Sequence, residues 1–264
     1  MKPIKSRILS CALGFLAGIA TVPLSSGAQY DQRLINISTR ARVGSGDNNA
    51  VIAGFVISPG PSKQVLIRAS GPSLTQPGIG VSAGDVLANP RIAVYDSHSV
   101  KILENDNWKV PGTGTLATSA DFSAVGAFPF SSDNDAALLA TLAPGSYTVI
   151  VNGEGTSTGL ALVEVYDVSG SSQLINLSTR AEVQTGANIV ISGLVVAPGS
   201  GTRRVLFRAI GPTLADFNVA NPLANPVMTI LNSNGTAIAS NDNWGSNGQG
   251  PTLAAALQPM APSR

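Results

Sequence analysis

The chain has 264 residues, of which 44% are hydrophobic and only 12% are charged, with 28 glycines and 17 prolines. Glycine and proline interrupt short apolar runs along most of its length, a composition typical of strands and turns and not of helices. The formal net charge is +1. No basic stripe that could neutralise phosphates is visible, which argues against nucleic-acid binding.

The first 28 residues have the pattern of a secretory signal peptide. Three basic side chains lie in residues 2–7, an apolar run covers residues 8–22, and small residues at 26–28 precede an expected cleavage before Gln29. We therefore expect export, with no membrane span after cleavage, because the apolar run is short for a bilayer. The only cysteine, Cys11, lies in this leader, so the exported chain is expected to lack disulfides and thiolate metal sites.

Period-two alternation of apolar residues predicts about eight strands in residues 33–170, and no helix is convincing there. In the first strand, one face carries Ile35, Ile37, Thr39, Ala41 and Val43. Such a set of strands closes best as an antiparallel β-sandwich, jelly-roll or immunoglobulin-like, in which two sheets bury one core. The expected strands are 34–43, 50–58, 64–70, 91–96, 100–104, 136–142, 146–152 and 159–168.

The second half of the chain repeats the first. The octapeptide at 34–41, Leu-Ile-Asn-Ile-Ser-Thr-Arg-Ala, recurs 140 residues later with a single change, and Asn-Asp-Asn-Trp at 105–108 recurs 136 residues later. We expect residues 29–172 to form a complete sandwich, and residues 173–264 to form a partial copy without counterparts of the last three strands. Two interpretations stay open: the chain is part of a longer repeat protein, which we favour, or the partial copy packs on the first.

The repeated motifs resemble a repeat found in large secreted bacterial surface proteins, most of which lack a described function. The resemblance rests on Leu-Ile-Asn-Leu-Ser-Thr-Arg-Ala, Val-Leu-Ile-Arg-Ala-Ser-Gly-Pro-Ser-Leu, Asn-Asp-Asn-Trp and Gly-Leu-Ala-Leu-Val-Glu-Val-Tyr-Asp. It covers nearly all of residues 33–170 and the front of the second copy. It implies an exported, β-rich, non-catalytic module, either secreted or on the bacterial cell surface, outside the outer membrane.

A shorter similarity links the chain to the bacterial pre-peptidase C-terminal domain, a β-sandwich appended to secreted hydrolases. Asn-Asp-Asn-Trp, then Leu-Ala-Pro-Gly-Ser-Tyr-Thr-Val-Ile-Val-Asn-Gly, and the closing Leu-Val-Glu-Val-Tyr-Asp carry it. This similarity implies an accessory domain of a secreted hydrolase system. No hydrolase domain accompanies it in this sequence.

Catalytic signatures are weak. His98 is the only histidine, it falls in an expected hairpin turn, and no Gly-x-Ser-x-Gly elbow is present for a serine triad. Acidic residues are few and lie mostly in turns, which does not favour a glycosidase pair. We expect no enzyme activity.

Acidic and amide residues gather in the expected loops around Asp106, Asp133 and Asp135. If these loops met at one end of a sandwich, their oxygens could hold a calcium ion, which takes six to eight oxygen ligands. The other interpretation, which we prefer, is that the side chains cap backbone groups in turns.

Two pairs of equivalent residues are candidate ligand contacts. Trp108 and Trp244 could stack on a sugar if exposed, but large aromatic rings usually fill a core. Arg68 and Arg208 could bind a ligand, but a cross-strand acidic partner is the plainer explanation.

These observations predict a structural or adhesive β-sandwich repeat whose partners would be a polysaccharide or cell-envelope component and adjacent repeats. The alternative is a calcium- or carbohydrate-binding accessory domain of a secreted hydrolase system.

Overall fold

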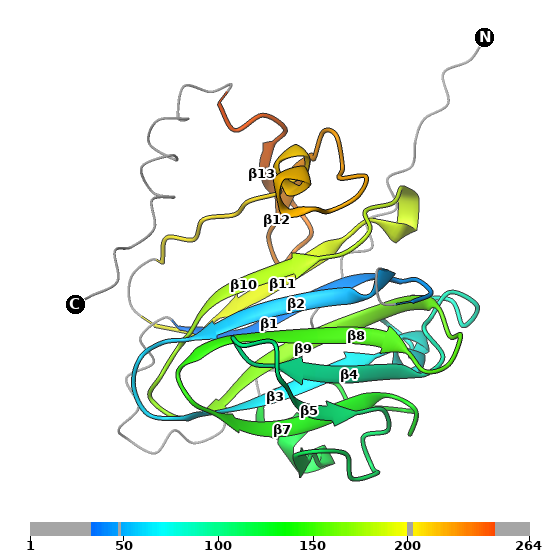
Figure 1. Ribbon diagram of the computed structural model, residues 1–264, viewed down its shortest axis with the longest axis vertical. Helices are drawn as coiled ribbons and strands as arrows, with labels where there is room; N and C mark the ends of the chain where they lie inside the picture. The colour runs from blue at the N-terminus through cyan, green and yellow to red at the C-terminus, as the bar shows by residue number, and fades with distance from the viewer. Residues whose placement is uncertain (1–32, 47–48, 200–202, 246–264) are drawn as a thin grey trace. The chain divides into compact units, whose positions relative to one another are not determined.

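The computed structural model describes residues 33–46, 49–199 and 203–245 (Figure 1). The expected signal peptide therefore lies outside the described residues. The chain divides into two compact units, with the boundary between Arg203 and Arg204. The larger unit is an antiparallel β-sandwich, as the sequence predicts, and each unit is described by itself below.

The described part of the larger unit contains eleven strands, and all eight that the sequence predicts for the first copy are present with ends within one residue of expectation. These eight are β1 (Leu34–Val43), β2 (Val51–Ile57), β3 (Lys63–Ser70), β4 (Pro90–Tyr95), β5 (Lys101–Asn105), β7 (Ala136–Leu142), β8 (Gly145–Gly153) and β9 (Gly159–Ser169). The others are β6 (Thr115–Leu116), β10 (Leu174–Arg180) and β11 (Ile191–Val196).

The strands form one curled sheet that folds into two layers (Figure 1). One layer has the order β10-β2-β8-β4-β5, and the other has the order β11-β1-β9-β3-β7-β6. The core between them takes side chains from both layers, such as Val65 and Ile67 of β3 and Val149 and Val151 of β8, all with 0% exposure. Alternation of apolar residues along each strand is thus what gives each layer its buried face.

One detail of the first strand differs from the predicted face. The pairing of β1 with β11 shifts register between Leu34 and Asn36, so the chain bulges at Ile35. Leu34 therefore joins the core at 7% exposure and Ile35 does not, whereas Ile37 and Val43 are buried as predicted. The bulge accounts for the change of face, because it adds one residue and reverses the alternation on one side of it.

The loop between β5 and β7 contains a short helix that the sequence analysis did not predict. Helix α1 (Ser119–Ala124) begins with a capping box, in which Thr118 and Asp121 each bond the other's backbone N–H. It places Phe122 in a second, smaller apolar cluster with Trp108, Leu66 and Leu139. The loop thereby covers the outer face of β3 and β7.

The first two strands of the second copy belong to the sandwich of the first copy. β10 pairs with β2, and β11 pairs with β1, so each layer gains one strand. Equivalent residues of the two copies then meet: Leu34 pairs with Leu174, and the Thr39 hydroxyl lies 2.6 Å from that of Thr179. Contact between equivalent positions is the mark of an approximate twofold relation. The second sequence copy begins at residue 173, whereas the second compact unit begins at Arg204. The two boundaries therefore differ.

The twofold relation extends to the register of these strands. Thr179 lies opposite Ala53, and Thr39 lies opposite Ser192, which is equivalent to Ala53 because the turn before β11 is one residue shorter than the turn before β2. The alternation of faces is therefore kept in both copies. Leu194, the counterpart of Phe55, packs against the core, while Val195, the counterpart of Val56, is 39% exposed.

The smaller unit keeps local features of the first copy. It contains a 3-10 helix (Pro212–Phe217) and the hairpin β12 (Met228–Leu231) and β13 (Ala237–Asn241). Gly71 and Gly211 begin equivalent 3-10 turns, and at both a Cβ would lie 2.0 Å from a backbone oxygen. Residues 203–210, equivalent to β3, form no strand. No helix in the described ranges is both long and apolar enough to span a membrane.

Candidate functional site

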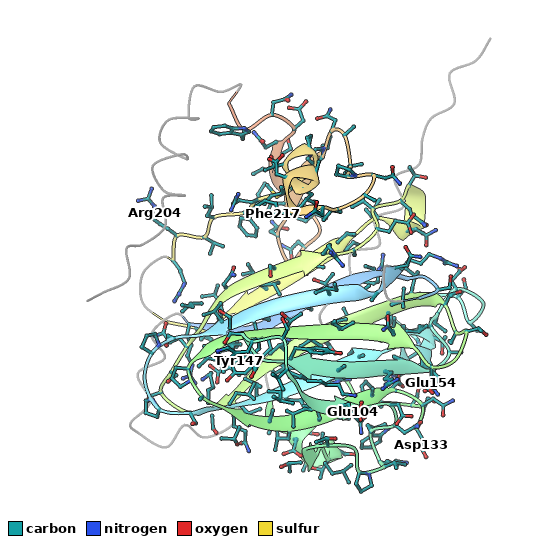
Figure 2. All side chains as sticks on the ribbon, viewed as in Figure 1. Glu104, Asp133, Tyr147, Glu154, Arg204 and Phe217 are labelled. Atoms are coloured by element: carbon teal, nitrogen blue, oxygen red, sulfur yellow. The ribbon has the colours of Figure 1, made fainter. Side chains whose placement is uncertain are left out.

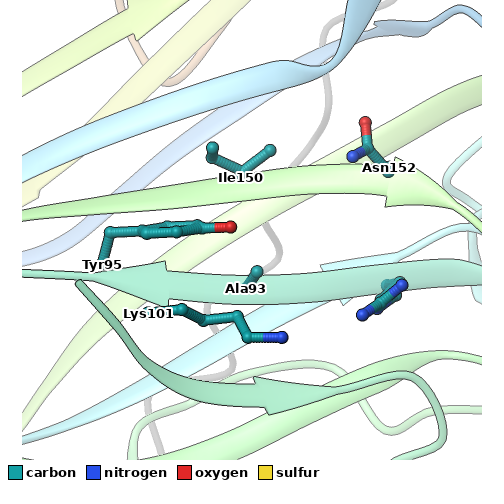
Figure 3. A pocket seen from close by; sticks show the side chains of 6 residues that line it. Ala93, Tyr95, Lys101, Ile150 and Asn152 are labelled. Atoms are coloured by element: carbon teal, nitrogen blue, oxygen red, sulfur yellow. The ribbon is translucent and has the colours of Figure 1, made fainter. Parts of the chain in front are cut away.

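A hollow of about 280 Å³ lies on the outer face of β4, β5 and β8. It is built from three cross-strand pairs: Arg91 opposite Asn152, Ala93 opposite Ile150, and Tyr95 opposite Lys101. Tyr95 and Lys101 extend over the face from one end, and Asn152 projects at the other (Figure 3). The floor is low because the middle pair contributes only an alanine and an isoleucine. The intervening residues of β4, Ile92 and Val94, are buried in the core.

The charges around the hollow form a small network. The Glu104 carboxylate accepts from Lys101 Nζ at 2.7 Å and from Arg91 Nη2 at 3.1 Å, and Glu154 lies 3.9 Å from Arg91. Glu104 belongs to β5 and Glu154 follows the end of β8, and both are labelled in Figure 2. The hydrogen bond from Lys101, followed by that from Arg91, lowers the pKa of Glu104, and the bond to Glu104 raises the pKa of Arg91. Arg91 and Glu104 therefore stay ionised, and the hollow offers hydrogen-bond donors beside a carboxylate acceptor and the Tyr95 ring.

The internal repeat provides a control for these residues. Arg91, Tyr95, Lys101 and Glu104 correspond to Val227, Leu231, Ala237 and Ser240 in the second copy. The hairpin forms there without them as β12 and β13. By contrast, the turn-forming Asp96 corresponds to Asn232, and each side-chain oxygen accepts from two backbone N–H groups at equivalent positions. The fold thus requires the turn residue but not the side chains of the hollow.

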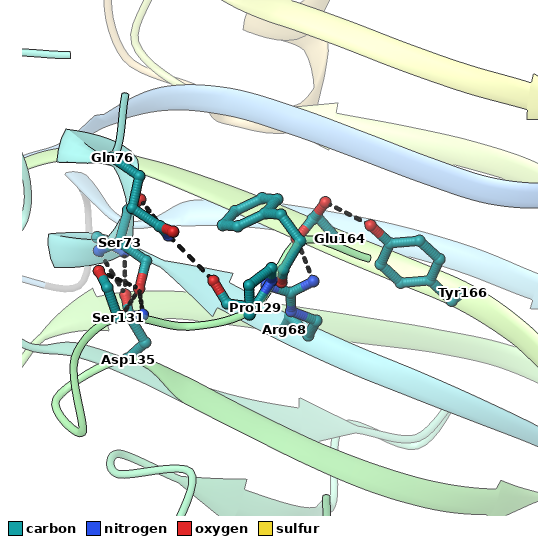
Figure 4. Close-up of polar contacts among 10 residues, drawn as sticks. Arg68, Ser73, Gln76, Pro129, Ser131, Asp135, Glu164 and Tyr166 are labelled. Carbon is teal, nitrogen blue, oxygen red and sulfur yellow. Dashed lines mark hydrogen bonds and ion pairs between the residues drawn. The ribbon is translucent and has the colours of Figure 1, made fainter. Parts of the chain in front are cut away.

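Arg68, a predicted site residue, is buried with 0% exposure. Its guanidinium lies 3.5 Å from the carboxylate of Glu164, which is directly opposite it on β9, and donates to the Phe128 carbonyl oxygen at 2.9 Å. The Tyr166 hydroxyl donates to the same carboxylate at 2.7 Å (Figure 4). The plainer prediction for Arg68, a cross-strand acidic partner, is confirmed. Arg208 is exposed in a segment without strand structure, and the structure gives it no equivalent setting.

Three phenylalanine rings complete the surroundings of Arg68. The guanidinium carbon lies 4.2–4.6 Å from the ring centroids of Phe122, Phe128 and Phe130. Cation–π attraction and one carboxylate thus replace the water that the cation loses on burial. This arrangement leaves Arg68 no surface for a ligand.

Asp135 ties the start of β7 to the chain just after β3. Its buried carboxylate accepts from the backbone N–H of Gly71 at 2.7 Å, and from the N–H and hydroxyl of Ser73 (Figure 4). Burial raises the pKa of Asp135, while these hydrogen bonds and Arg68 act in the opposite direction. The residue serves the fold by satisfying two buried N–H groups.

Replacing Asp135 by alanine should lower the free energy of unfolding by about 2–3 kcal/mol, because buried N–H donors lose their acceptor. A raised pKa in the folded state means that the native protein binds the extra proton. The contribution of Asp135 to stability is therefore greatest below the usual aspartate pKa and falls as pH rises through the raised value. Urea unfolding between pH 4 and 7 measures this, and Asp135→Asn is the matched control, because it lacks this pH component. Parallel pH profiles for the wild-type protein and Asp135→Asn would contradict the assignment.

The predicted calcium residues do not come together. Asp135 is engaged as above, Asp133 is exposed and pairs with Lys109 at 2.6 Å, and Asp106 is only half buried. In the described part of the chain, no group of three or more His, Cys, Asp or Glu side chains could hold a metal ion. The neighbouring Asn105 bonds the carbonyl oxygens of Asn107 and Val110 and accepts from Ala137 N–H, as expected for a turn residue.

The two tryptophans occupy different environments. Trp108 is 8% exposed, packs against Phe122 and Phe130, and donates from Nε1 to the Ser132 carbonyl oxygen at 3.0 Å. It is therefore a core residue. Trp244, in the smaller unit, is 60% exposed.

Sequence reasoning missed the hollow and a buried ion pair. Lys63 and Asp167 lie 2.7 Å apart with fully buried side chains, and Arg33 reaches Asp167 at 3.4 Å. A signal for the hollow was available, namely the four side chains that the second copy does not repeat. His98 lies on the surface with its side chain 84% exposed, beside Asp96.

Comparison with protein-family models finds no family that matches this chain, and comparison with curated proteins finds no relative.

Proposed function

We propose that the protein is a non-catalytic β-sandwich repeat module that is exported to the cell exterior, where it is secreted or displayed on the surface. Its role is structural and adhesive. The observation that supports this most strongly is the contrast between interior and outer face. The charged side chains Arg68, Glu164, Lys63 and Asp167 are engaged in buried pairs, whereas the exposed hollow carries polar and aromatic side chains that the fold does not require.

The chemistry of the hollow fits a polysaccharide of the cell envelope. A sugar ring has an apolar face that packs on an aromatic ring such as Tyr95, and hydroxyls that bond to side chains of the kind at Arg91, Lys101, Asn152 and Glu104. An open, rigid face on neighbouring strands suits an extended chain better than a small molecule that needs enclosure. The accessory domain of a hydrolase system remains the second candidate, because the same hollow would bind the polysaccharide that the hydrolase cleaves.

The test is retention of the whole exported chain on insoluble polysaccharides and on purified cell envelopes. Tyr95→Ala and Arg91→Ala should each weaken binding about tenfold, which corresponds to about 1.4 kcal/mol. Lys109→Ala is the control, since Lys109 is an exposed cation that pairs with Asp133 outside the hollow. Binding that survives both substitutions would show that the adhesive surface lies outside the hollow. If the folded wild-type protein is not retained at all, a purely structural role is left.

Calcium is tested by repeating the retention measurement in EDTA. The hollow consists of organic side chains and needs no ion, so binding should be unchanged. Loss of binding in EDTA would revive the metal-dependent alternative.

A further inference from the structure

Two nearly identical segments of the chain have different exposure. β1 and β10 share the sequence of residues 34–40 and 174–180, which differ only in Ile37 and its counterpart Leu177. In β1, Asn36, Thr39 and Arg40 are 6%, 1% and 9% exposed. In β10 the corresponding Asn176 and Arg180 are exposed, and Thr179 is half buried. Since the sequences match, the surroundings and not the residues cause the difference.

The surroundings differ by one strand. β1 lies between β9 and β11 and is paired along its length on both sides. β10 is paired with β2 along one edge. Along its other edge, within the described ranges, Leu174 meets Leu34 at the start, Glu182 meets Arg42 just beyond the end, and residues 176–180 have no strand partner.

The relation between the copies specifies which strand fits the open edge. β1 is paired on that side by β9, with Ser38 opposite Glu164 and Arg40 opposite Leu162. The inner face of β9 consists of small and β-branched residues, such as Ala161 and Val163, at 0–1% exposure. β10 presents the same backbone and nearly the same side chains, so it offers the same template in the same register.

We propose that the open edge of β10 is a strand-acceptor site for a strand of the β9 type, supplied by a further copy of the repeat. Such a strand would pair antiparallel with residues 176–180, placing its equivalent of Glu164 opposite Ser178. An exposed strand edge carries unpaired N–H and C=O groups, and addition of a strand satisfies them while alternate side chains determine specificity. This site extends one layer of the sandwich continuously from repeat to repeat. It goes beyond the proposed adhesive function and shares no residue with the hollow.

A synthetic peptide of residues 158–170, which contains β9, tests the site with the full chain. Hydrogen exchange measured by mass spectrometry should slow about tenfold or more for residues 176–180 at saturating peptide, with no change for residues 34–43. A peptide with Val163→Asp is the matched control and should give no protection, because it places a charge on the inner face. Equal protection by both peptides, or protection only at the other edge strands β5, β6 and β11, would overturn the proposal.

A second experiment supplies the added strand within the same chain, so that self-association of the peptide cannot affect the result. A chain in which residues 109–172 follow Trp244 a second time carries its own second β9. Residues 176–180 should then exchange as slowly as residues 36–40 do in the first copy. Unchanged exchange in this chain, with the first copy still folded, would also overturn the proposal.

Discussion

Trp108→Ala should lower the free energy of unfolding by about 3–5 kcal/mol, the range for removing a large buried aromatic side chain. The ring fills the space between the loop after β5 and the outer face of β3 and β7, with centroids 5.2 Å from Phe122 and 5.9 Å from Phe130. Its removal also leaves the Ser132 carbonyl oxygen without the Nε1 donor. The cavity and the lost hydrogen bond act in the same direction.

Trp244→Ala is the matched control, because Trp244 occupies the equivalent position of the repeat and is 60% exposed. We expect a change within about 0.5 kcal/mol, as for most surface substitutions. Urea unfolding followed by circular dichroism measures both variants without depending on tryptophan fluorescence. Similar losses at the two positions would show that the second copy buries its tryptophan in solution and would contradict the structure.

The fold of the first copy could be read from the sequence because its strands alternate strictly. Val65, Ile67 and Ala69 face the core as predicted, and the predicted ends of β7 match the structure. The bulge at Ile35 could not be predicted, since it depends on the pairing of β1 with β11, a strand from the other copy. Pairing partners far apart in sequence are a tertiary property that alternation does not encode.

The hollow was not predicted for a similar reason. Arg91 and Asn152 become neighbours only when β4 pairs with β8, and nothing local to either strand indicates that pairing. The predicted candidates were instead residues that both copies repeat, such as Trp108 and Arg68. In this chain repetition marked residues that the fold needs in its interior, so the more informative signal for a binding face was the absence of repetition.

Arg68→Met should lower the free energy of unfolding by about 3–5 kcal/mol, the cost of removing one partner of a buried ion pair. Methionine fills much of the space between the three phenylalanine rings, so the loss comes mainly from charge. The Glu164 carboxylate would stay buried, with the Tyr166 hydroxyl as its hydrogen-bond donor. Urea unfolding at pH 7 measures the effect.

Glu164→Gln should be less costly than Arg68→Met, because the cation keeps the three ring faces and the Phe128 carbonyl oxygen. The double variant should lose less stability than the sum of the single variants, since no unpaired charge is then buried. The exposed pair Lys109–Asp133, with side chains 55% and 67% exposed, should show almost no coupling in the same cycle. Additive losses at Arg68 and Glu164 would mean that the rings alone hold the cation. Strong coupling would mean instead that the Glu164 carboxylate on β9 is what allows an arginine in the middle of β3. A strand without that acid could then not replace β9 beside β3.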